Sequence, residues 1–237
     1  MLKRLVVTFD GLGSQTSEAP AAEGEVAVLV KVALNVDLAG VGIGGDLWPA
    51  ATMFSNVVVS EAYRGFFSEL FCGKNIIELG SGTGLCGILI DKMFSPASVV
   101  ITDQESHMAL ISSNIALNDT SSVCTVSALD WTDHATFPPE PFDVVLALEC
   151  VYKEGLYSPL IDALVHCLRP GGVILLGLTR QFAKPLFFQK LVQRGLQYCL
   201  IPHESLPAAC VSSTGGNDCG LFVLQTRPSN IDNCSSL

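Results

Sequence analysis

The stretch with the clearest chemical potential is Glu78-Leu79-Gly80-Ser81-Gly82-Thr83-Gly84, which lies where a strand-like apolar run meets a helix-like one. Glycines at alternate positions let the backbone approach a ligand closely, because no Cβ stands in the way. The unpaired N–H groups at the start of the following helix can hold an anion such as a carboxylate. We therefore expect a ligand site that includes Glu78, Gly80, Gly82 and Gly84.

Two kinds of cofactor compete for this turn. The glycines Gly82-x-Gly84-x-x-Gly87 also fit the pattern of nicotinamide dinucleotide sites, with Asp103 at a plausible distance for a ribose contact. An acidic residue such as Glu78 would repel a pyrophosphate, whereas it suits the surroundings of a positively charged sulfonium. The residues therefore favour S-adenosyl-L-methionine over a dinucleotide.

Further candidates follow the next two strand-like runs. Asp103 comes directly after Val99-Val100-Ile101-Thr102, where a carboxylate can accept hydrogen bonds from both hydroxyls of a ribose. The alternative is that Asp103 caps a helix that begins near Glu105. After the third run, Asp130 can accept from an adenine amino group and Trp131 can stack on the base. By itself, such a tryptophan is more often a core residue.

The fourth strand-like run leads into Glu149-Cys150-Val151-Tyr152. Methyl transfer from a sulfonium is an in-line displacement by a neutral amine, so positioning supplies much of the rate. Glu149 can align the nitrogen or relay its proton, and Tyr152 can form a wall of the channel. In the alternative interpretation, Glu149 caps the end of the strand and Tyr152 packs over the sheet. Cys150 is interpreted as a packed thiol, because no base lies near it in sequence.

The histidines and cysteines do not indicate a metal site. The four histidines (His107, His134, His166 and His203) lie far apart and lack the spacing of metal ligands. The nine cysteines never occur as Cys-x-x-Cys, and their number is odd. We expect no metal, and we expect reduced thiols that are mostly buried.

The elements that must position these residues alternate between short apolar runs and helix-like stretches, which predicts a mostly parallel sheet. The predicted strands are Ile76 to Leu79, Ser98 to Thr102, Val123 to Leu129, Phe142 to Leu148, Gly172 to Leu178, Gln197 to Pro202 and Leu221 to Gln225. Apolar residues three or four apart predict helices over Leu85 to Phe94, Glu105 to Asn118, Pro159 to Leu168 and Pro185 to Arg194. Ser158 is the predicted cap of the third of these helices. The last two strands have only a loop between them, which favours antiparallel pairing.

The N-terminal part is organised differently. The segment from Gly11 to Gly24 has no periodicity and is predicted to be a loop or a mobile arm before a strand from Glu25 to Val36. A helix is expected over Met53 to Leu70, with Pro49 near its start and Gly73 at its end.

Composition limits the class of protein. A chain of 237 residues with 49% hydrophobic residues is suited to one α/β domain. Its apolar runs are shorter than the roughly 18 residues of a membrane span, and the apolar stretch before Asp10 is too short for a signal-peptide core. The formal net charge of −10 opposes nucleic-acid binding and favours a basic protein partner.

Together these residues resemble methyltransferase family 16, the seven-strand protein methyltransferases that include lysine methyltransferases acting on chaperones and translation factors. The resemblance covers roughly Gly44 to Gln225. It rests on Leu47-Trp48-Pro49-Ala50, the turn from Glu78 to Gly84, Asp103, Asn114, Leu129-Asp130-Trp131 and Arg169-Pro170-Gly171-Gly172.

The resemblance implies a Rossmann-like seven-stranded α/β fold with a mostly parallel sheet and an antiparallel last strand. It implies cofactor contacts from Trp48, Gly80, Gly82, Asp103 and Trp131, with Asp130 beside the adenine. Where the family usually has Asp-x-x-Tyr or Asp-x-x-Phe, this chain has Glu149, which keeps the charge and extends its reach by one methylene.

The implied function is S-adenosylmethionine-dependent methylation of a lysine side chain in a protein substrate. Two alternatives stay open: a catalytically inactive methyltransferase-like binding module, which the Glu149 departure motivates, and a small-molecule methyltransferase. We expect an N-terminal arm and strand extension over residues 1–39, the methyltransferase domain over 40–228 and a tail over 229–237. The protein is expected to be a monomer in the cytoplasm or nucleus, with no membrane or nucleic-acid partner.

Overall fold

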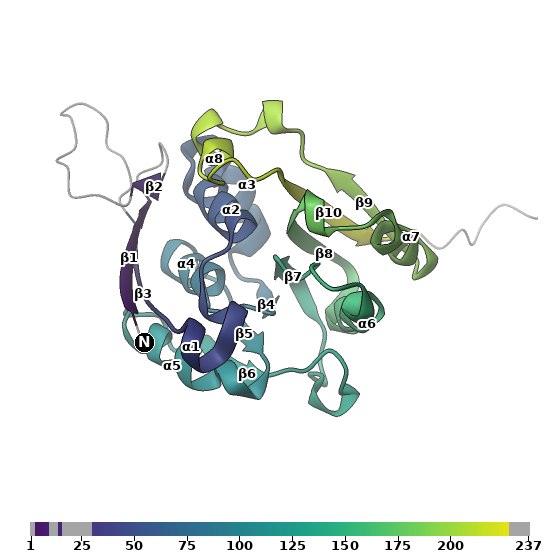
Figure 1. The fold of residues 1–237 in the computed structure, drawn as a ribbon, viewed down its shortest axis with the longest axis horizontal. Coiled ribbons are helices and arrows are strands. Elements are labelled where there is room, and N and C mark those ends of the chain that lie inside the picture. The colour runs from purple at the N-terminus through teal and green to yellow at the C-terminus, as the bar shows by residue number, and fades with distance from the viewer. Residues whose placement is uncertain (1–2, 10–13, 16–29, 228–237) are drawn as a thin grey trace, which may run out of the picture.

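The computed structural model describes residues 3–9, 14–15 and 30–227. Seven strands form its main sheet: β4 (Asn75–Leu79), β5 (Ser98–Asp103), β6 (Cys124–Ala128), β7 (Phe142–Leu148), β8 (Leu168–Thr179), β9 (Leu196–Leu200) and β10 (Cys219–Thr226). Their order is β6-β5-β4-β7-β8-β10-β9. Neighbours from β6 to β8 pair in parallel, whereas β10 runs antiparallel to both β8 and β9 (Figure 1). The predicted fold class is confirmed.

Helices cover both faces of this sheet, because its central strands are apolar on both sides. On one face lie α2 (Pro49–Val59), α3 (Arg64–Phe71), α4 (Leu85–Met93) and α5 (Met108–Ala116); on the other lie α6 (Tyr157–Cys167) and α7 (Pro185–Gln193). Within β4, Ile76 packs on the first face and Ile77 on the second, and both are fully buried. Burial of one such side chain contributes about 1.5–3 kcal/mol.

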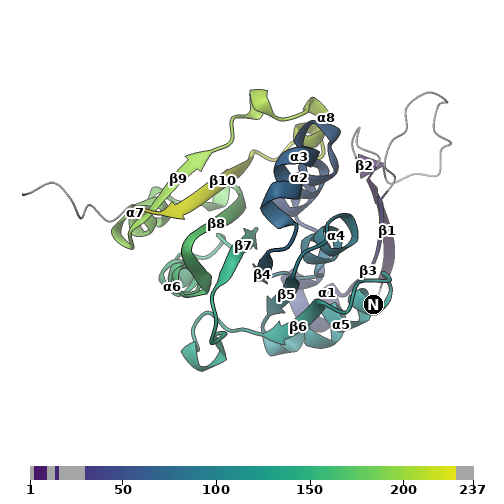
Figure 2. The ribbon, with the colours of Figure 1, turned by 180° about the vertical axis from the view of Figure 1, so that it is seen from behind.

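A second, small sheet covers the outer side of α4 and α5, as both views of the ribbon show (Figures 1 and 2). It consists of β1 (Lys3–Phe9), β2 (Ser14–Gln15) and β3 (Val30–Val36), paired antiparallel in the order β2-β1-β3. Val32 and Leu34 of β3 are fully buried in the core. The N-terminal segment therefore contributes to the packed body of the molecule.

The outer edge of β3 is paired with asparagine side chains of the α5 segment. Asn118 exchanges two hydrogen bonds with the backbone of Ala33, at 2.8 and 2.6 Å. Asn114 does the same with Asn35, at 2.6 and 3.1 Å, and its side-chain amide also donates to the carbonyl of Thr83 at 2.9 Å. Asn114 thereby links the small sheet to the glycine turn.

Several local predictions are corrected. The helix expected over Met53 to Leu70 is two helices, because the chain is extended at Ser60 (ψ 132°) after three consecutive valines, which are poor helix formers. The predicted loop from Gly11 to Gly24 contains β2, and β1 was not predicted because its alternation becomes informative only once β3 pairs with it. Residues 25–29 of the predicted strand, and the tail over 229–237, lie outside the described residues.

Two further corrections concern the C-terminal half. The helix α6 begins at Tyr157, one residue before Ser158, so Ser158 does not cap it. The connection between β9 and β10 is more than a loop, because it contains the short helix α8 (Ala208–Ser212). Gly73 follows the end of α3 with φ of 69°, as predicted. Within the described part of the chain, no helix has the length and apolar character that crossing a bilayer requires.

Candidate functional site

A cavity of about 410 Å³ opens where the carboxyl ends of β4, β5, β6 and β7 meet. This is the edge at which open α/β sheets bind ligands. The lining residues come from the ends of these strands and from the segment that leads into α2. They include seven of the eight predicted cofactor residues, namely Trp48, Glu78, Gly80, Gly82, Asp103, Asp130 and Trp131, and both predicted catalytic residues, Glu149 and Tyr152.

The glycine turn forms the floor of the cavity because only glycine fits there. Gly80 and Gly82 both have φ of 59°, in the left-handed region. A Cβ on Gly82 would lie 2.6 Å from the carbonyl oxygen of Gly44, and one on Gly80 would lie 2.8 Å from Cζ2 of Trp131. Gly84 does not line the cavity; it stands at the N-cap of α4 with φ of 80° and shapes the turn instead.

Glu78 is the most deeply buried acid of the site, with 2% of its surface exposed. Its Oε2 accepts a hydrogen bond of 2.8 Å from the backbone of Gly87. Burial raises the pKa of Glu78 to about 8, because the charged form loses its hydration; the hydrogen bond from Gly87 opposes this, and the charge of Asp103 adds to it. A cation in the cavity would favour the ionised form.

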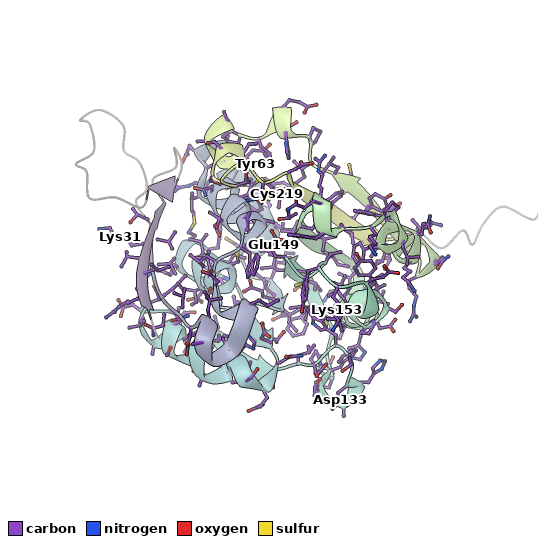
Figure 3. The ribbon with its side chains drawn as sticks, viewed as in Figure 1. Lys31, Tyr63, Asp133, Glu149, Lys153 and Cys219 are labelled. Atoms are coloured by element: carbon purple, nitrogen blue, oxygen red, sulfur yellow. The ribbon has the colours of Figure 1, made fainter. Side chains whose placement is uncertain are left out.

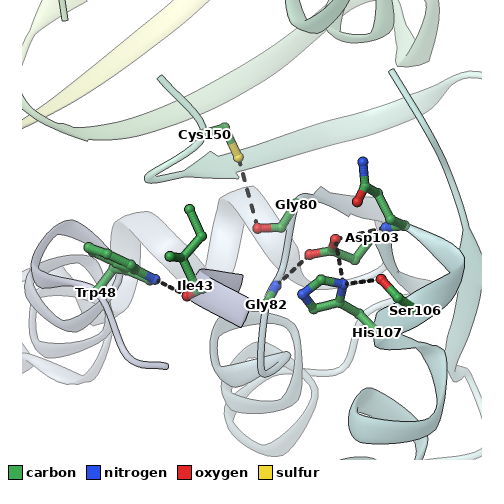
Figure 4. A network of polar contacts seen from close by, with 9 residues as sticks. Ile43, Trp48, Gly80, Gly82, Asp103, Ser106, His107 and Cys150 are labelled. Carbon is green, nitrogen blue, oxygen red and sulfur yellow. Dashed lines mark hydrogen bonds and ion pairs between the residues drawn. The ribbon is translucent and has the colours of Figure 1, made fainter. Parts of the chain in front are cut away.

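Asp103 is held by backbone donors on both sides (Figure 4). Its Oδ2 accepts from the amide of Gly82 at 2.8 Å, and its Oδ1 accepts from the amide of Gln104 at 2.7 Å. His107 places Nδ1 3.3 Å from the same Oδ1. Asp103 does not cap the following helix, because the short 3₁₀ helix at Glu105–His107 has no side-chain cap.

Two tryptophans flank the cavity. The indole N–H of Trp48 donates to the carbonyl of Ile43 at 2.9 Å, which folds the preceding segment against the cavity (Figure 4). Trp131 borders Gly80 with its ring edge and is partly buried. Asp130 accepts from both the amide and the hydroxyl of Thr132, at 2.8 and 2.7 Å, which fixes its carboxylate beside Trp131. The contacts of all these residues with a cofactor stay predictions.

Glu149 ties three elements together near the centre of the molecule (Figure 3). Its Oε1 accepts from the amide of Ala50 at 2.9 Å and from the hydroxyl of Thr179 at 2.6 Å; its Oε2 accepts from the amide of Thr179 at 3.1 Å. Ala50 lies in the first turn of α2, where free N–H groups and the helix dipole favour a carboxylate. Glu149 also has φ of 62°, a conformation that costs about 1–2 kcal/mol for a residue with a Cβ.

The side chains that follow Glu149 differ in environment. Cys150 is buried and its thiol donates to the carbonyl of Leu79 at 3.1 Å. Burial raises its pKa well above the ordinary range, so it stays a thiol. Tyr152 is 47% exposed at the rim. Burial of part of its ring raises the pKa of Tyr152, so its hydroxyl keeps its proton at neutral pH.

The charge of the lining is one-sided. Five carboxyl groups line the cavity, from Asp46, Glu78, Asp103, Asp130 and Glu149, of which Glu78, with its pKa of about 8, is mostly protonated at neutral pH without a ligand. Among the described residues that line it there is no lysine and no arginine. A cationic ligand therefore fits better than a pyrophosphate. Two buried polar atoms on the same lining, the Oγ of Ser81 and the Nε2 of His107, have no hydrogen-bond partner in the protein.

Three lining residues were missed by reasoning from the sequence. Asp46 precedes the Leu47-Trp48-Pro49-Ala50 segment, and its acidic character was the available signal. Ser81 lies inside the glycine turn, where only the glycines received attention. His107 was considered only as a metal ligand, and its position four residues after Asp103, directly beyond the end of β5, was the available signal. No cluster of His, Cys, Asp or Glu that could hold a metal occurs in the described residues.

The sheet order and the carboxyl-lined cavity agree with those expected of a methyltransferase that uses S-adenosylmethionine. Residues 31–194 match the model of the lysine methyltransferase family, and the chain belongs to that family. The resemblance noted from its motifs is thereby confirmed.

Individual relatives agree with this assignment. The chain is 29% identical to the protein-lysine N-methyltransferase EFM6 of Saccharomyces cerevisiae over 172 residues, which is 63% of this chain and 70% of the relative. It is 31% identical to EEF1A lysine methyltransferase 3 of Xenopus tropicalis, over 65% of this chain and 66% of the relative.

Solved structures share the fold. An O-methyltransferase family protein from Burkholderia thailandensis superposes with a TM-score of 0.55 at 15% identity, covering 73% of this chain and 58% of that one. The methyltransferase SMU.776, solved in complex with SAH, superposes with a TM-score of 0.53 at 15% identity, covering 82% and 54%.

Proposed function

We propose that the protein transfers a methyl group from S-adenosylmethionine to the side-chain amine of a lysine in a protein substrate. The observation that carries this proposal is the cavity at the ends of β4 to β7, lined by five carboxyl groups and by no lysine or arginine among the described residues. It occurs in a chain of the lysine methyltransferase family. Its volume, about 410 Å³, lies within the range of small-molecule sites.

The cofactor supplies an electrophilic methyl group on a positively charged sulfur. Around it, the residues of this chain would bind and orient. Amides of the glycine turn and of the start of α4 would hold the methionine carboxylate. Asp103 would hold the ribose, and Asp130 and Trp131 would hold the adenine. Gly80 and Gly82 allow Trp131 and Gly44 to pack closely on the turn, since a Cβ on either glycine would lie within 2.8 Å of their atoms.

Glu149 is the residue that we place nearest the acceptor amine. A carboxylate has about four lone-pair positions. Three of them are used by Ala50 and Thr179. The remaining position can accept a hydrogen bond from the lysine nitrogen. This hydrogen bond aligns the lone pair of the nitrogen with the methyl group, and the carboxylate receives a share of the proton of the nitrogen. The hydrogen bonds to Ala50 and Thr179 keep the carboxylate in place during that step.

An aromatic rim marks the route of the substrate. Tyr152 and Phe182 line the cavity and are 47% and 45% exposed, which is high for large apolar side chains. The four methylene groups of a lysine can lie against such rings while its amine reaches inward.

The acidic charge of the protein suits a basic partner surface, and we propose a chaperone or a translation-related protein as substrate. We further propose a monomer that works in the cytoplasm or nucleus.

The test is transfer of labelled methyl groups from S-adenosylmethionine to proteins in a cell extract. We expect a labelled protein band, with label on lysine by mass spectrometry. Label in small molecules alone would support a small-molecule methyltransferase, and no label in any extract would support an inactive binding protein. Both outcomes would contradict the proposal.

The matched variants are Gly82→Arg and Gly65→Arg. The first fills the cofactor space and is expected to abolish binding of S-adenosylhomocysteine in calorimetry. The second adds the same side chain on α3, where nothing lies within 4 Å of the new Cβ. It is expected to bind like the natural protein, so unchanged binding by Gly82→Arg would disprove the site.

A further inference from the structure

His107 is a buried side chain of the cofactor cavity with one ring nitrogen unused. Only 6% of the residue is exposed. Its Nδ1 lies 3.3 Å from Oδ1 of Asp103 and 3.2 Å from the hydroxyl of Ser106. Its Nε2 is buried and has no partner in the protein. Buried polar atoms are nearly always paired, so this nitrogen calls for a partner that the protein itself does not supply.

The free nitrogen lies beside a backbone segment that lines the ligand space. Figure 4 shows it on the side of the ring away from Ser106. It faces Gly44, where a Cβ would lie 2.3 Å from it, and both residues line the cavity. Only glycine fits at position 44 beside this nitrogen, because any side chain there would collide with the imidazole ring.

The carboxylate of Asp103 is too fully engaged to recognise a ribose alone. Its oxygens offer about four lone-pair positions. The amides of Gly82 and Gln104 use two of them, and the third faces Nδ1 of His107. One position is left, on Oδ2. The expectation that Asp103 accepts hydrogen bonds from both ribose hydroxyls therefore lacks one acceptor.

We propose that His107 supplies that acceptor: its Nε2 accepts a hydrogen bond from one ribose hydroxyl of the cofactor, while Asp103 accepts from the other. With a proton on Nδ1, placed there by the neighbouring oxygens of Asp103 and Ser106, the neutral ring carries its lone pair at Nε2. The ligand class is a nucleoside with a vicinal diol. This inference rests on the proposed function, because it needs the cofactor in this cavity.

The test pairs changes in the protein with changes in the ligand. S-adenosylhomocysteine and its 2′-deoxy and 3′-deoxy analogues are titrated into the natural protein, His107→Asn and His107→Gln. The asparagine amide can keep the contact with Asp103 but does not reach the position of Nε2, whereas the glutamine amide can. We expect His107→Asn to bind S-adenosylhomocysteine about tenfold more weakly, and His107→Gln to recover part of that loss. Against one of the two deoxy analogues, His107→Asn and the natural protein should bind equally.

His166→Asn is the matched control, because His166 is a histidine whose Nε2 is already paired, with the carbonyl of Pro138 at 2.8 Å. It should bind all three ligands like the natural protein. A loss of equal size for all three ligands in His107→Asn would mean a structural role and would overturn the inference. If the natural protein bound none of the ligands, the proposed function would fail together with the inference. If it bound S-adenosylhomocysteine but the His107 variants showed no selective loss, only the inference would fail.

A second measurement needs no variant. In the natural protein, the imidazole ¹⁵N resonance of Nε2 of His107 should move when S-adenosylhomocysteine is added, and should move much less with the deoxy analogue that lacks its partner hydroxyl. Equal movement with all three ligands would contradict the proposed contact, even if every His107 variant failed to fold.

Discussion

Two cavities in the described part of the chain lie against the same sheet, and they differ in chemistry. The cofactor cavity is lined by five carboxyl groups and by two unpartnered polar atoms, and its backbone holds Gly80, Gly82 and Glu149 at positive φ. The second cavity, of about 240 Å³, lies between α2, α3 and the strands β8 and β10. Its lining is apolar throughout, and the one hydroxyl there, of Tyr63, is bonded to the carbonyl of Ser205. Convergent polar atoms and strained backbone, more than hollow space, distinguish a reactive site from a packing gap.

The largest effect on activity is expected from substitution of Glu149 in the cofactor cavity. We expect Glu149→Ala to reduce kcat by about 100-fold or more, because α2 loses the cap at Ala50 and the amine loses its alignment. Glu149→Gln keeps a hydrogen-bond acceptor for Ala50 and loses the charge. If the amine depends on the charge, steady-state kinetics will show both variants impaired. Nearly full activity of Glu149→Gln would instead restrict the residue to holding α2.

Glu78 gives the next largest effect, through pH. Its pKa of about 8 in the folded state lies above the ordinary 4.5, so the folded protein binds a proton more tightly than the unfolded one. The stability that this proton contributes is fully present below pH 4.5 and is lost as the pH rises toward 8. We expect the unfolding free energy of the ligand-free protein to fall by a few kcal/mol, as an order of magnitude, over this interval.

Urea unfolding at pH 5.5 and pH 8.5 measures this, with Glu78→Gln as the comparison. The variant has no proton to lose at this position, so its decline with pH should be smaller. Affinity for S-adenosylmethionine should rise toward pH 8 in the natural protein, because the cation favours the ionised carboxylate. Parallel pH profiles of the two proteins would refute the assignment of the proton to Glu78.

The smallest effect is expected in the apolar cavity. Val57 lines it and is 1% exposed. The substitution Val57→Ile adds one methyl group to empty apolar space and should raise the unfolding free energy by about 0.5–1 kcal/mol. The Kd for S-adenosylhomocysteine should stay unchanged. A tenfold change in that Kd would show that the two cavities are coupled and that the contrast between them is too simple.

How far the sequence reaches depends on the range of the contacts. The strand over Phe142 to Leu148 was predicted with its observed bounds, because a short run between turns that is apolar except for Asp143 is a local signal. The glycine turn was also found from a local signal, the alternate glycines between Glu78 and Gly84. The partners of Glu149 were not, since Ala50 lies 99 residues away and Thr179 lies 30 away, and only the folded sheet brings them to one carboxylate.

The asparagines that pair with β3 have a consequence for the nascent chain. Their partners in β3 precede them by 79 and 85 residues, so the outer edge of β3 leaves the ribosome long before anything can cover it. An open strand edge is prone to pair with other chains. Synthesis of residues 114–118 closes that edge, and the same amide of Asn114 then reaches Thr83. The side chain that covers part of this strand edge is thus also one that holds the ligand-binding turn.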